Sequence, residues 1–261
     1  TYFKALYKRH TNFAMEPMEH NFSGQADFGR KPETIIPRNA DVLLGMVLMV
    51  KLAKVTISGD TSTMTTTKFA WCRRLGHAMI SSVTLEIGGS LIEKHYGDWL
   101  NIWYELSHAK GQEEGYAKMI GDVDALTSLD TASTDCLSDG QIKPAYTLYV
   151  PMQFSFCRTV GLAIPLIALQ YHDIKVRFDF LPAAQLCCYT GSISTYGTLK
   201  MDDASLLLNF GFLDVKERTK YSRVPHEYLI EQLQFSQETV SGSTIKPRLQ
   251  FNHPTKEMIF A

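Results

Sequence analysis

Alternation of apolar and polar residues is the feature that most restricts how this chain can fold. In the range Ile174–Phe180, four apolar side chains alternate with three charged ones. Similar alternation occurs at Val83–Ile87 and Tyr146–Phe156. Because successive side chains of a strand point to opposite faces of a sheet, each run predicts a strand with one buried face. Such strands are typical of antiparallel sheets that pack one face on a core.

Further strands are expected where apolar residues cluster without strict alternation. Val42–Ala53 and Leu206–Val215 are apolar on both faces, which is typical of strands buried deep in a sandwich. Periodicity alone fits a buried helix there as well. Weaker strand patterns occur at His20–Phe28, Tyr228–Phe235, Arg248–Phe251 and Met258–Phe260.

Two helices are expected between these strands. The apolar residues of Asp98–Ser107 follow i, i+3, i+4, i+7 spacing, which predicts one stripe that covers the end of a sandwich: Trp99, Ile102, Trp103 and Leu106. Asp98 is the expected N-cap of this helix, and Gly111 is its expected stop. A shorter helix is expected over Gln112–Ile120, ending at Gly121.

Together these elements predict an all-β fold, a jelly-roll β-sandwich with short helical insertions. Helices do not alternate with strands, which argues against a parallel βαβ architecture. The range Asp122–Lys143 is rich in Asp, Ser and Thr, and we expect a long solvated loop there. The charged, proline-containing range 216–228 is expected to be a linker, after which the final residues open a second domain.

Composition excludes several classes of protein. With 45% apolar residues, 20% charged residues and a net charge of −1, the chain is typical neither of disordered proteins nor of dedicated nucleic-acid binders. The longest apolar run, Val42–Val50, is too short to span a membrane, and no signal peptide opens the chain. Five cysteines at irregular spacing indicate an intracellular protein rather than a disulfide framework. The chain lacks an initial Met and ends in the apolar MIFA, so we interpret it as a piece of a longer polypeptide.

A search for catalytic and metal-binding motifs assigns no site residue. The segment His226–Ile230 is one residue short of the HExxH zinc motif, because an Ile stands where a second imidazole is needed. Asp122 and Asp124 begin like a calcium loop, but the required Gly and Glu do not follow. Neither a GxSxG turn nor a phosphate-binding glycine motif is present. We therefore expect no catalytic, cofactor-binding or metal-ligating residues and no enzymatic activity. A cupin-like metal site, built from scattered His residues on separate strands, is the alternative.

The remaining clusters have structural interpretations. Three basic clusters, Lys8–His10, Arg73–Arg74 and Lys216–Lys220, lack interleaved aromatic residues and are expected to be solvated or to form salt bridges. The pair Cys187–Cys188 is expected to be packed or free thiols. Asn21 begins an N-glycosylation sequon that we interpret as a chance match. The 12 Tyr, 14 Phe and 3 Trp residues fit a large β core and subunit interfaces equally well.

Five long blocks resemble the major capsid proteins of nucleocytoplasmic large DNA viruses, including the iridovirus and phycodnavirus types. The blocks are FKALYKRHTNFAMEP at 3–17, the segment Arg73–Leu106 beginning RRLGHAMISSVTLEIGG, the segment Leu148–Phe178, HEYLIEQLQF at 226–235 and FNHPTKEMIFA at 251–261. They follow the order of the family and extend over nearly the whole chain, which makes the resemblance far more specific than a short motif.

The resemblance implies a structural protein with a double jelly roll. Residues 1–221 would form the N-terminal segment and the first jelly roll, with a sandwich from about Glu19 to Val215. Residues 222–261 would form a linker and the opening strands of a second, truncated jelly roll. The implied assembly is a homotrimer of pseudo-hexagonal outline that tiles an icosahedral shell. Its partners would be neighbouring capsomers and minor capsid proteins, without direct nucleic-acid contact, in a virion assembled in the host cytoplasm. A jelly-roll carbohydrate-binding module is the alternative function.

Overall fold

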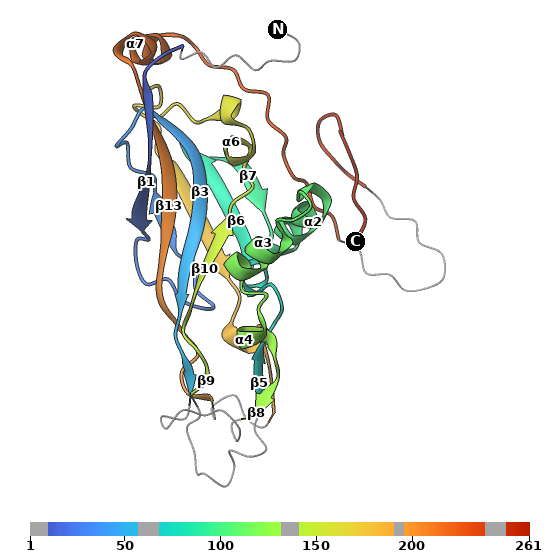
Figure 1. The fold of residues 1–261 in the computed structure, drawn as a ribbon. Helices are drawn as coiled ribbons and strands as arrows, with labels where there is room; N and C mark the ends of the chain where they lie inside the picture. The colour runs from blue at the N-terminus through green and yellow to red at the C-terminus, as the bar shows by residue number, and fades with distance from the viewer. Residues whose placement is uncertain (1–9, 57–67, 132–140, 191–195, 238–248) are drawn as a thin grey trace.

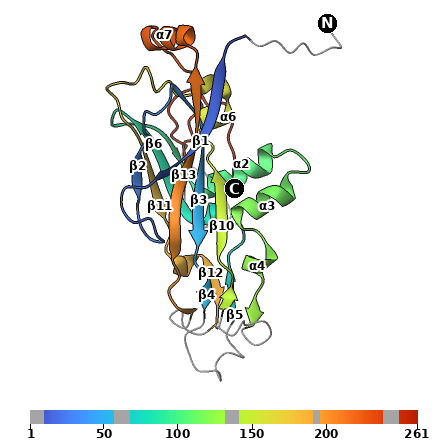
Figure 2. The ribbon, with the colours of Figure 1, turned by 60° about the vertical axis from the view of Figure 1, so that its left-hand side comes forward.

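Two four-stranded antiparallel sheets form the body of the protein. The computed structural model describes residues 10–56, 68–131, 141–190, 196–237 and 249–261. One sheet, here called the β3 sheet, has the order β1 (Phe13–Asn21), β13 (Met201–Leu213), β3 (Val42–Leu52) and β10 (Tyr146–Pro151). The other, the β6 sheet, has the order β2 (Glu33–Ile35), β11 (Ile174–Phe180), β6 (Ile80–Ile87) and β7 (Ser90–His95). Figure 1 and Figure 2 show the two sheets as the layers of an elongated sandwich.

The connections between the sheets define a jelly roll. The chain starts in the β3 sheet with β1, crosses to β2 in the β6 sheet and returns to β3. The last strand, β13, inserts between β1 and β3 and pairs antiparallel with both. The two sheets form a sandwich of eight strands, and the chain passes from one sheet to the other between them. This arrangement confirms the predicted all-β jelly-roll class.

The core lies between the two sheets, and the inward side chains of both sheets fill it. The fully buried ones include Leu48 and Val50 of β3, Leu206 and Leu208 of β13, Val83 and Leu85 of β6, and Val176 and Phe178 of β11. Phe22 packs edge-to-face on Phe178, with ring centroids 5.5 Å apart. In each strand every second side chain points into this core, and for this reason apolar and polar residues alternate in the sequence.

Smaller elements attach to the ends and flank of the sandwich. A three-stranded sheet contains β12 (Cys187–Tyr189), β5 (Lys68–Trp71) and β8 (Asp130–Thr131), and a two-stranded one contains β4 (Val55–Thr56) and β9 (Gln141–Lys143). The helices are α1 (Leu75–Ala78), α2 (Gly97–Ser107), α3 (Glu113–Ile120), α4 (Asp124–Thr127), α6 (Ser155–Arg158) and α7 (Val215–Arg223). Two single-turn 3₁₀ helices span Val160–Leu162 and Ala183–Gln185. In Figure 1, α2 and α3 lie together on the flank beside β7 and β10.

Several predicted elements match the structure closely. The strand over Ile174–Phe180 is confirmed at both ends, and the apolar segment Val42–Ala53 forms β3. The helix expected up to Ile120 is confirmed, and Gly121 ends it in the left-handed conformation with φ of 80°. In each case the core or a required backbone geometry determines the residue types, so the local sequence is enough to predict the element.

The first predicted helix is only partly correct. Its extent matches α2, but Tyr96 rather than Asp98 is the N-cap, and the helix ends at Ser107, before Gly111. The expected apolar stripe is also wrong, because Leu100 is the buried apolar residue while Leu106 is 64% exposed. The helix therefore turns its expected stripe partly toward solvent.

Three strand or loop predictions are wrong inside the sandwich. The alternation of Tyr146–Phe156 continues past the end of β10, because Met152, Phe154 and Phe156 reach the core from a turn and from α6. The strand expected at His20–Phe28 lies mostly upstream, in β1. The loop expected over Asp122–Lys143 contains α4, β8 and β9, and its residues 132–140 lie outside the described part.

The C-terminal predictions also differ from the structure. Tyr228–Phe235 and Met258–Phe260 are extended but form no strand, and neither do the described residues of Arg248–Phe251. Much of the predicted linker, 216–228, is helical, because Asp214 caps α7 by accepting a hydrogen bond from the Val215 amide. Among the described residues, no helix has the length and apolar character needed to cross a bilayer.

Candidate functional site

A concave region with polar and aromatic lining lies among α1, α2 and α3, and two glycines let these elements approach. A Cβ on Gly97 would lie 2.2 Å from the carbonyl oxygen of His77 and 2.5 Å from that of Ile80. A Cβ on Gly76 would lie 2.7 Å from a methyl group of Val150 on β10. Only glycine fits both positions, so α1 lies directly against the start of α2 and the face of β10.

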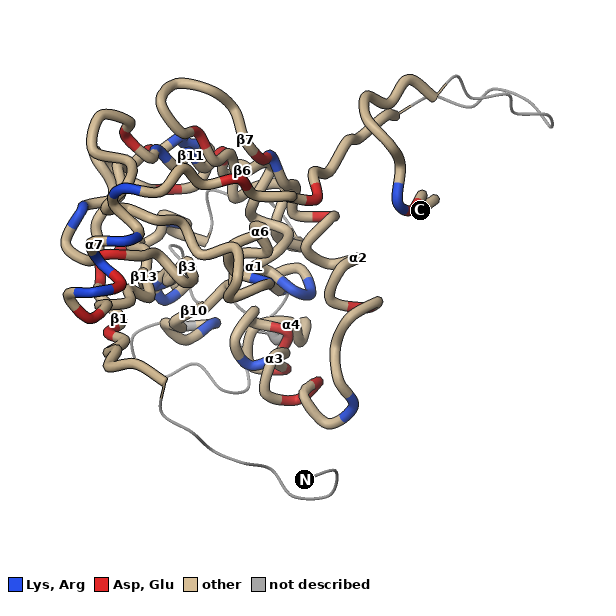
Figure 3. The backbone as a smooth tube through the Cα atoms, turned by 90° about the horizontal axis from the view of Figure 1, so that it is seen from above, with Lys and Arg blue, Asp and Glu red and all other residues tan. Residues whose placement is uncertain are grey.

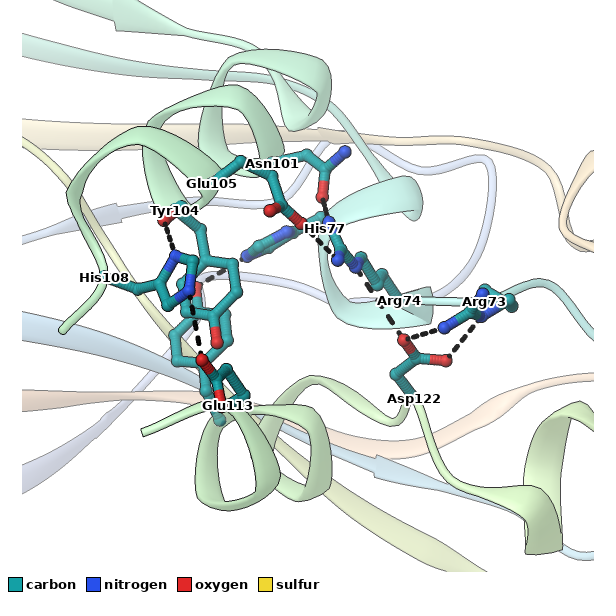
Figure 4. Close-up of polar contacts among 10 residues, drawn as sticks. Arg73, Arg74, His77, Asn101, Tyr104, Glu105, His108, Glu113 and Asp122 are labelled. Atoms are coloured by element: carbon teal, nitrogen blue, oxygen red, sulfur yellow. Dashed lines mark hydrogen bonds and ion pairs between the residues drawn. The ribbon is translucent and has the colours of Figure 1, made fainter. Parts of the chain in front are cut away.

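Two consecutive arginines at the start of α1 anchor the surrounding helices. Arg74 adopts the left-handed conformation, with φ of 52° and ψ of 45°, which turns the chain into α1. Its guanidinium donates to the side-chain oxygens of Asn101 and Glu105 on α2. Arg73 donates from Nε and Nη2 to the two oxygens of Asp122, at 3.0 and 3.1 Å. Figure 4 shows these contacts converging from three segments.

Asp122 is the shared anion of this arrangement. Its side chain is 11% exposed, and its second oxygen also lies 3.7 Å from Nε of Arg74. Hydrogen bonding to Asp122 raises the pKa of Arg73 further above its usual value. A bidentate pair fixes direction as well as distance, so Asp122 ties the end of α3 to the start of α1. The salt-bridge role expected of Arg73–Arg74 is confirmed.

A stack of aromatic rings lies beside the ion pairs. The rings of Tyr104 and Tyr116 are 4.0 Å apart and nearly parallel, and His108 stacks on Tyr104 at 4.7 Å. The hydroxyl of Tyr116 lies 2.7 Å from Nε2 of His77. Burial, and then the nearby charge of Arg74, lower the pKa of His77 to about 4, so this imidazole is neutral at pH 7. Burial likewise raises the pKa of Tyr116, which keeps its hydroxyl protonated.

In this region, ion pairs and hydrogen bonds hold three helices together. The residues around its cavity of about 370 Å³ come from α1, α2, α3 and their flanking turns. Its arginines are engaged with Asp122, Asn101 and Glu105, and its histidine is neutral and hydrogen-bonded to a tyrosine. The hydroxyl of Tyr116 lies next to the His77 imidazole, but burial keeps that hydroxyl protonated, so these side chains act as hydrogen-bonding and ion-pairing groups that fix the surface.

A second polar group is buried under β7 and α6. The carboxylate of Glu93 accepts hydrogen bonds from the backbone amide of Ser155 at 3.1 Å and from its hydroxyl. Nε2 of His95 lies 3.5 Å from the same carboxylate, and the imidazole stacks on Phe154 at 5.0 Å. Burial raises the pKa of Glu93, whereas burial and the charge of Arg158 lower the pKa of His95 to about 4.

These residue types recur in hydrolytic triads, but their order here is different. The hydroxyl of Ser155 donates to Glu93 rather than to His95, so the imidazole is not placed to remove its proton as in a triad. All three side chains are buried, which closes the group to a substrate. Sequence reasoning missed the group because Glu93 and Ser155 are far apart in the chain. The available signal was a carboxylate at an inward position of a strand.

The other candidate residues are dispersed. His226 donates from Nε2 to the backbone oxygen of Tyr221, 2.7 Å away, and Asp124 begins α4. Asn21 is exposed at the end of β1. Arg218, from the third basic cluster, pairs with the buried Asp41 at 3.0 Å. Lys8 and Arg9 lie outside the described residues.

The cysteine and histidine residues of the described ranges form no metal-binding cluster. Cys72, Cys157, Cys187 and Cys188 are free thiols, and Cys136 lies outside those ranges. Within the part of the chain that the structure describes, no group of three His, Cys, Asp or Glu residues is arranged to hold a metal ion. Burial raises the pKa of Cys157 to about 12, so this thiol is protonated and unreactive at neutral pH.

Comparison with known proteins gives consistent relatives. The family profile described as "Major capsid protein N-terminus" matches residues 1–214. Capsid protein 1 of Acanthamoeba polyphaga mimivirus is 49% identical over 98% of this chain and 44% of its own length. The major capsid protein of Phaeocystis pouchetii virus is 41% identical over 100% of this chain and 54% of its own length. The chain spans about half the length of the curated relatives that it matches.

Solved structures agree with the sequence relatives. A quasi-atomic structure of the PBCV-1 virus capsid matches with a TM-score of 0.76 and 35% identity, over 98% of this chain and 57% of the matched chain. The major capsid protein of Faustovirus matches with a TM-score of 0.64 at 13% identity, which shows a shared fold alone.

Proposed function

The chain belongs to the viral major capsid protein family, and on that premise we propose that it is a structural subunit of an icosahedral virion shell. The observation that carries the proposal is the 49% identity to a mimivirus capsid protein across 98% of the chain. The polar groups described above support it, because they join elements of the sandwich to one another and form no reactive centre. We propose accordingly that the protein is not an enzyme.

The proposed subunit is a double jelly roll. Residues 1–221 are proposed to be the N-terminal segment and first roll, and 222–261 the linker and opening strands of the second. The chain covers 44% to 59% of the length of three curated relatives, which supports this division because it leaves room for a second sandwich of similar size.

Three such subunits are proposed to form a trimer with a pseudo-hexagonal outline. A closed ring of this kind uses heterologous contacts, so each subunit needs two different surfaces. The exposed apolar residues Phe13 and Met15 on β1 and Leu91 and Leu106 near α2 lie on different parts of the molecule and support this requirement. The trimers are proposed to contact neighbouring capsomers and minor capsid proteins, and to assemble in the host cytoplasm.

Direct binding of nucleic acid is not part of the proposal. The net charge is −1, and Figure 3 shows basic and acidic residues interspersed around α7 and along β11 and β6. Many of these charges form pairs, such as Arg177 with both Glu33 and Glu86. A surface of paired, mixed charges lacks the electrostatic footprint of a phosphate-binding protein.

Light scattering coupled to size-exclusion chromatography tests the proposed assembly. The full-length protein is expected to elute with three times the mass of one subunit, and electron micrographs should show particles of hexagonal outline. A mass equal to one subunit across a wide range of protein concentration would refute the trimer. The carbohydrate-binding alternative makes the opposite prediction, namely saturable binding on a glycan array by a protein that does not assemble.

A further inference from the structure

The segment that follows α7 crosses the surface of the first sandwich as a strap. Residues 224–235, here called the strap, run in Figure 1 from α7 past α6 toward α2. In the described structure the strap forms neither helix nor strand beyond Val224, whose amide donates to the carbonyl oxygen of Lys220. Its position therefore depends on side chains rather than on a backbone ladder.

Four side chains of the strap contact the sandwich and its helices, between positions 228 and 235. They are Tyr228, which donates to the backbone oxygen of Ala163 at 3.0 Å; Glu231, which pairs with Arg158 at 3.4 Å; Gln232, which donates to the backbone oxygen of Ile92 at 2.6 Å; and Phe235, whose ring lies 5.3 Å from that of Tyr96. Ile92 belongs to β7, the edge strand of the β6 sheet, so the strap also covers part of an open sheet edge.

No side chain of the strap is fully buried. Leu229 is 94% exposed and Phe235 is 63% exposed. Ile230 and Leu233 are half-buried, so hydrophobic burial is only part of this docking. An extended segment held in this way depends on a few directed polar contacts. Among the four, the contact between charged side chains is the one between Arg158 and Glu231, whose Nη1 and Oε2 lie 3.4 Å apart.

Contacts with the body of the protein, apart from the strap, orient the guanidinium of Arg158. The side chain is 17% exposed, and its guanidinium carbon lies 4.8 Å from the centre of the Trp103 ring on α2. Arg158 also lies near Glu93, where burial raises the pKa of the carboxyl and the charge of Arg158 offsets part of that rise. A planar cation that is stacked and partly buried keeps one orientation, which makes it a specific receptor for a carboxylate.

Glu231 connects three segments through one carboxylate. One of its oxygens pairs with Arg158 of α6, and the other pairs with Lys256 near the end of the chain. Both cations lower the pKa of Glu231, with Lys256 the larger cause, so the carboxylate is charged at neutral pH. The sandwich, the strap and residues around Lys256 are thereby tied at one point.

We infer that Arg158 and Glu231 form a clasp that sets the direction in which the chain leaves the first jelly roll. Arg158 is the positioning residue, and Glu231 is the group that it positions. The inference rests on the proposed function, because in a double jelly roll this direction determines how the second sandwich is oriented against the first. The clasp would then act on capsomer shape without lying in a contact between subunits.

Limited proteolysis of the full-length protein with chymotrypsin tests the clasp, because cleavage beside Leu229 and Phe235 requires the strap to leave the surface. The test variants are Glu231→Gln, Arg158→Lys and the double variant. Glu227→Gln is the matched control, since it removes an exposed carboxylate from the same strap without touching Arg158. Thermal melts establish that each variant is folded, and the exposed position of Glu231 makes Glu231→Gln the variant least able to disturb the core.

Each single variant is expected to speed cleavage within the strap about two- to fivefold, the range for loss of partly exposed ion pairs. Glu231→Gln also removes the pair with Lys256, so it should be the faster single variant. The double variant should be no faster than Glu231→Gln alone, because that change already removes the contact with Arg158. Cleavage of Glu231→Gln at the rate of Glu227→Gln, or effects that multiply in the double variant, would overturn the clasp.

Light scattering on the same samples separates this inference from the proposed function. A wild-type trimer whose cleavage rate is unaffected by Glu231→Gln refutes the clasp alone. A wild-type monomer whose cleavage is accelerated by Glu231→Gln refutes the trimer and leaves the clasp standing.

Discussion

Acid should destabilise this fold through a histidine that must stay neutral. His77 is buried between α1 and α3 and has a pKa of about 4, against an ordinary value of 6.5. In the unfolded chain the imidazole binds a proton below pH 6.5, whereas in the folded chain it does so only below about 4. The unfolded state therefore binds more protons in this window, and the free energy of unfolding falls as the pH is lowered through it.

The size of this effect follows from the pKa difference. The pKa is lowered from 6.5 to about 4, a difference of about 2.5, and each pKa unit corresponds to about 1.4 kcal/mol, so His77 accounts for a loss of about 3.5 kcal/mol. That is a large fraction of the 5 to 15 kcal/mol, roughly, that stabilises a typical domain. The contribution is fully present above pH 6.5 and is lost progressively between pH 6.5 and about 4.

Urea unfolding at a series of pH values measures this contribution directly. His77→Gln should flatten the pH dependence, because a neutral amide replaces the imidazole near the hydroxyl of Tyr116. His226→Gln is the control, since His226 is half-buried at the surface and donates its hydrogen bond to a backbone oxygen. Two other buried groups are present in all three proteins. His95, with a pKa of about 4, adds an acid-dependent loss of the same sign, and Glu93 acts in the opposite direction, because its raised pKa makes stability fall as the pH rises. The reasoning is refuted if wild type and His77→Gln lose stability in parallel between pH 7 and 4.5.

Three further predictions concern packing and ion pairs, and thermal or urea unfolding measures each of them. Gly97→Ala should lower the free energy of unfolding by about 3 kcal/mol or more, because the new Cβ would lie 2.2 Å from a backbone oxygen. Gly115→Ala has open space around it in α3 and should raise the free energy of unfolding by about 0.5 to 1 kcal/mol. Equal effects of the two changes would contradict this account. Asp122→Asn should cost about 1 to 2 kcal/mol, less at high salt, and a loss independent of salt would be inconsistent with ion pairing. Phe178→Ala should cost about 3 to 5 kcal/mol, and a cost below 1 kcal/mol would show that the ring is not central to the core.

The alternating pattern predicted those strands whose surroundings select their residue types. The strand β11 is readable because one face is buried against the other sheet and the other is charged. By contrast, β1 is largely exposed on both faces, and its strand conformation comes from pairing along its whole length with β13, nearly two hundred residues later. No local pattern records that pairing.

The errors beyond β10 and at the C-terminus have a related cause. Apolar residues at every second position fit a strand, but in Met152–Phe156 the same spacing serves a turn and the start of α6, because all of these side chains reach one core. The strap carries a strand-like sequence in Tyr228–Phe235, yet it is held by side chains and pairs with no strand in the described structure.

The polar sites were the least predictable part because each joins segments that are distant in sequence. Arg73 and Arg74 were recognised as a basic pair, but their partners Asn101, Glu105 and Asp122 are identified only by the fold. The Glu93–Ser155 contact likewise spans 62 positions. Spacing motifs detect sites formed within one helix or loop, and these sites are formed between elements.

The position of these contacts explains how the helices of the flank are held in place against the sandwich. The helices α2 and α3 belong to the insertion between β7 and β10, and insertions of this length are ordinarily mobile. Here the close contact at Gly97 holds the start of α2, the bidentate pair at Asp122 holds the end of α3, and the stacked Tyr104 and Tyr116 join the two helices. A heterologous ring closes only if both contacting surfaces of each subunit keep a fixed angle, since a variable angle gives open or irregular assemblies. Under the proposed trimer, fixing this flank to the sandwich at separate points would give the insertion the constant geometry that ring closure requires.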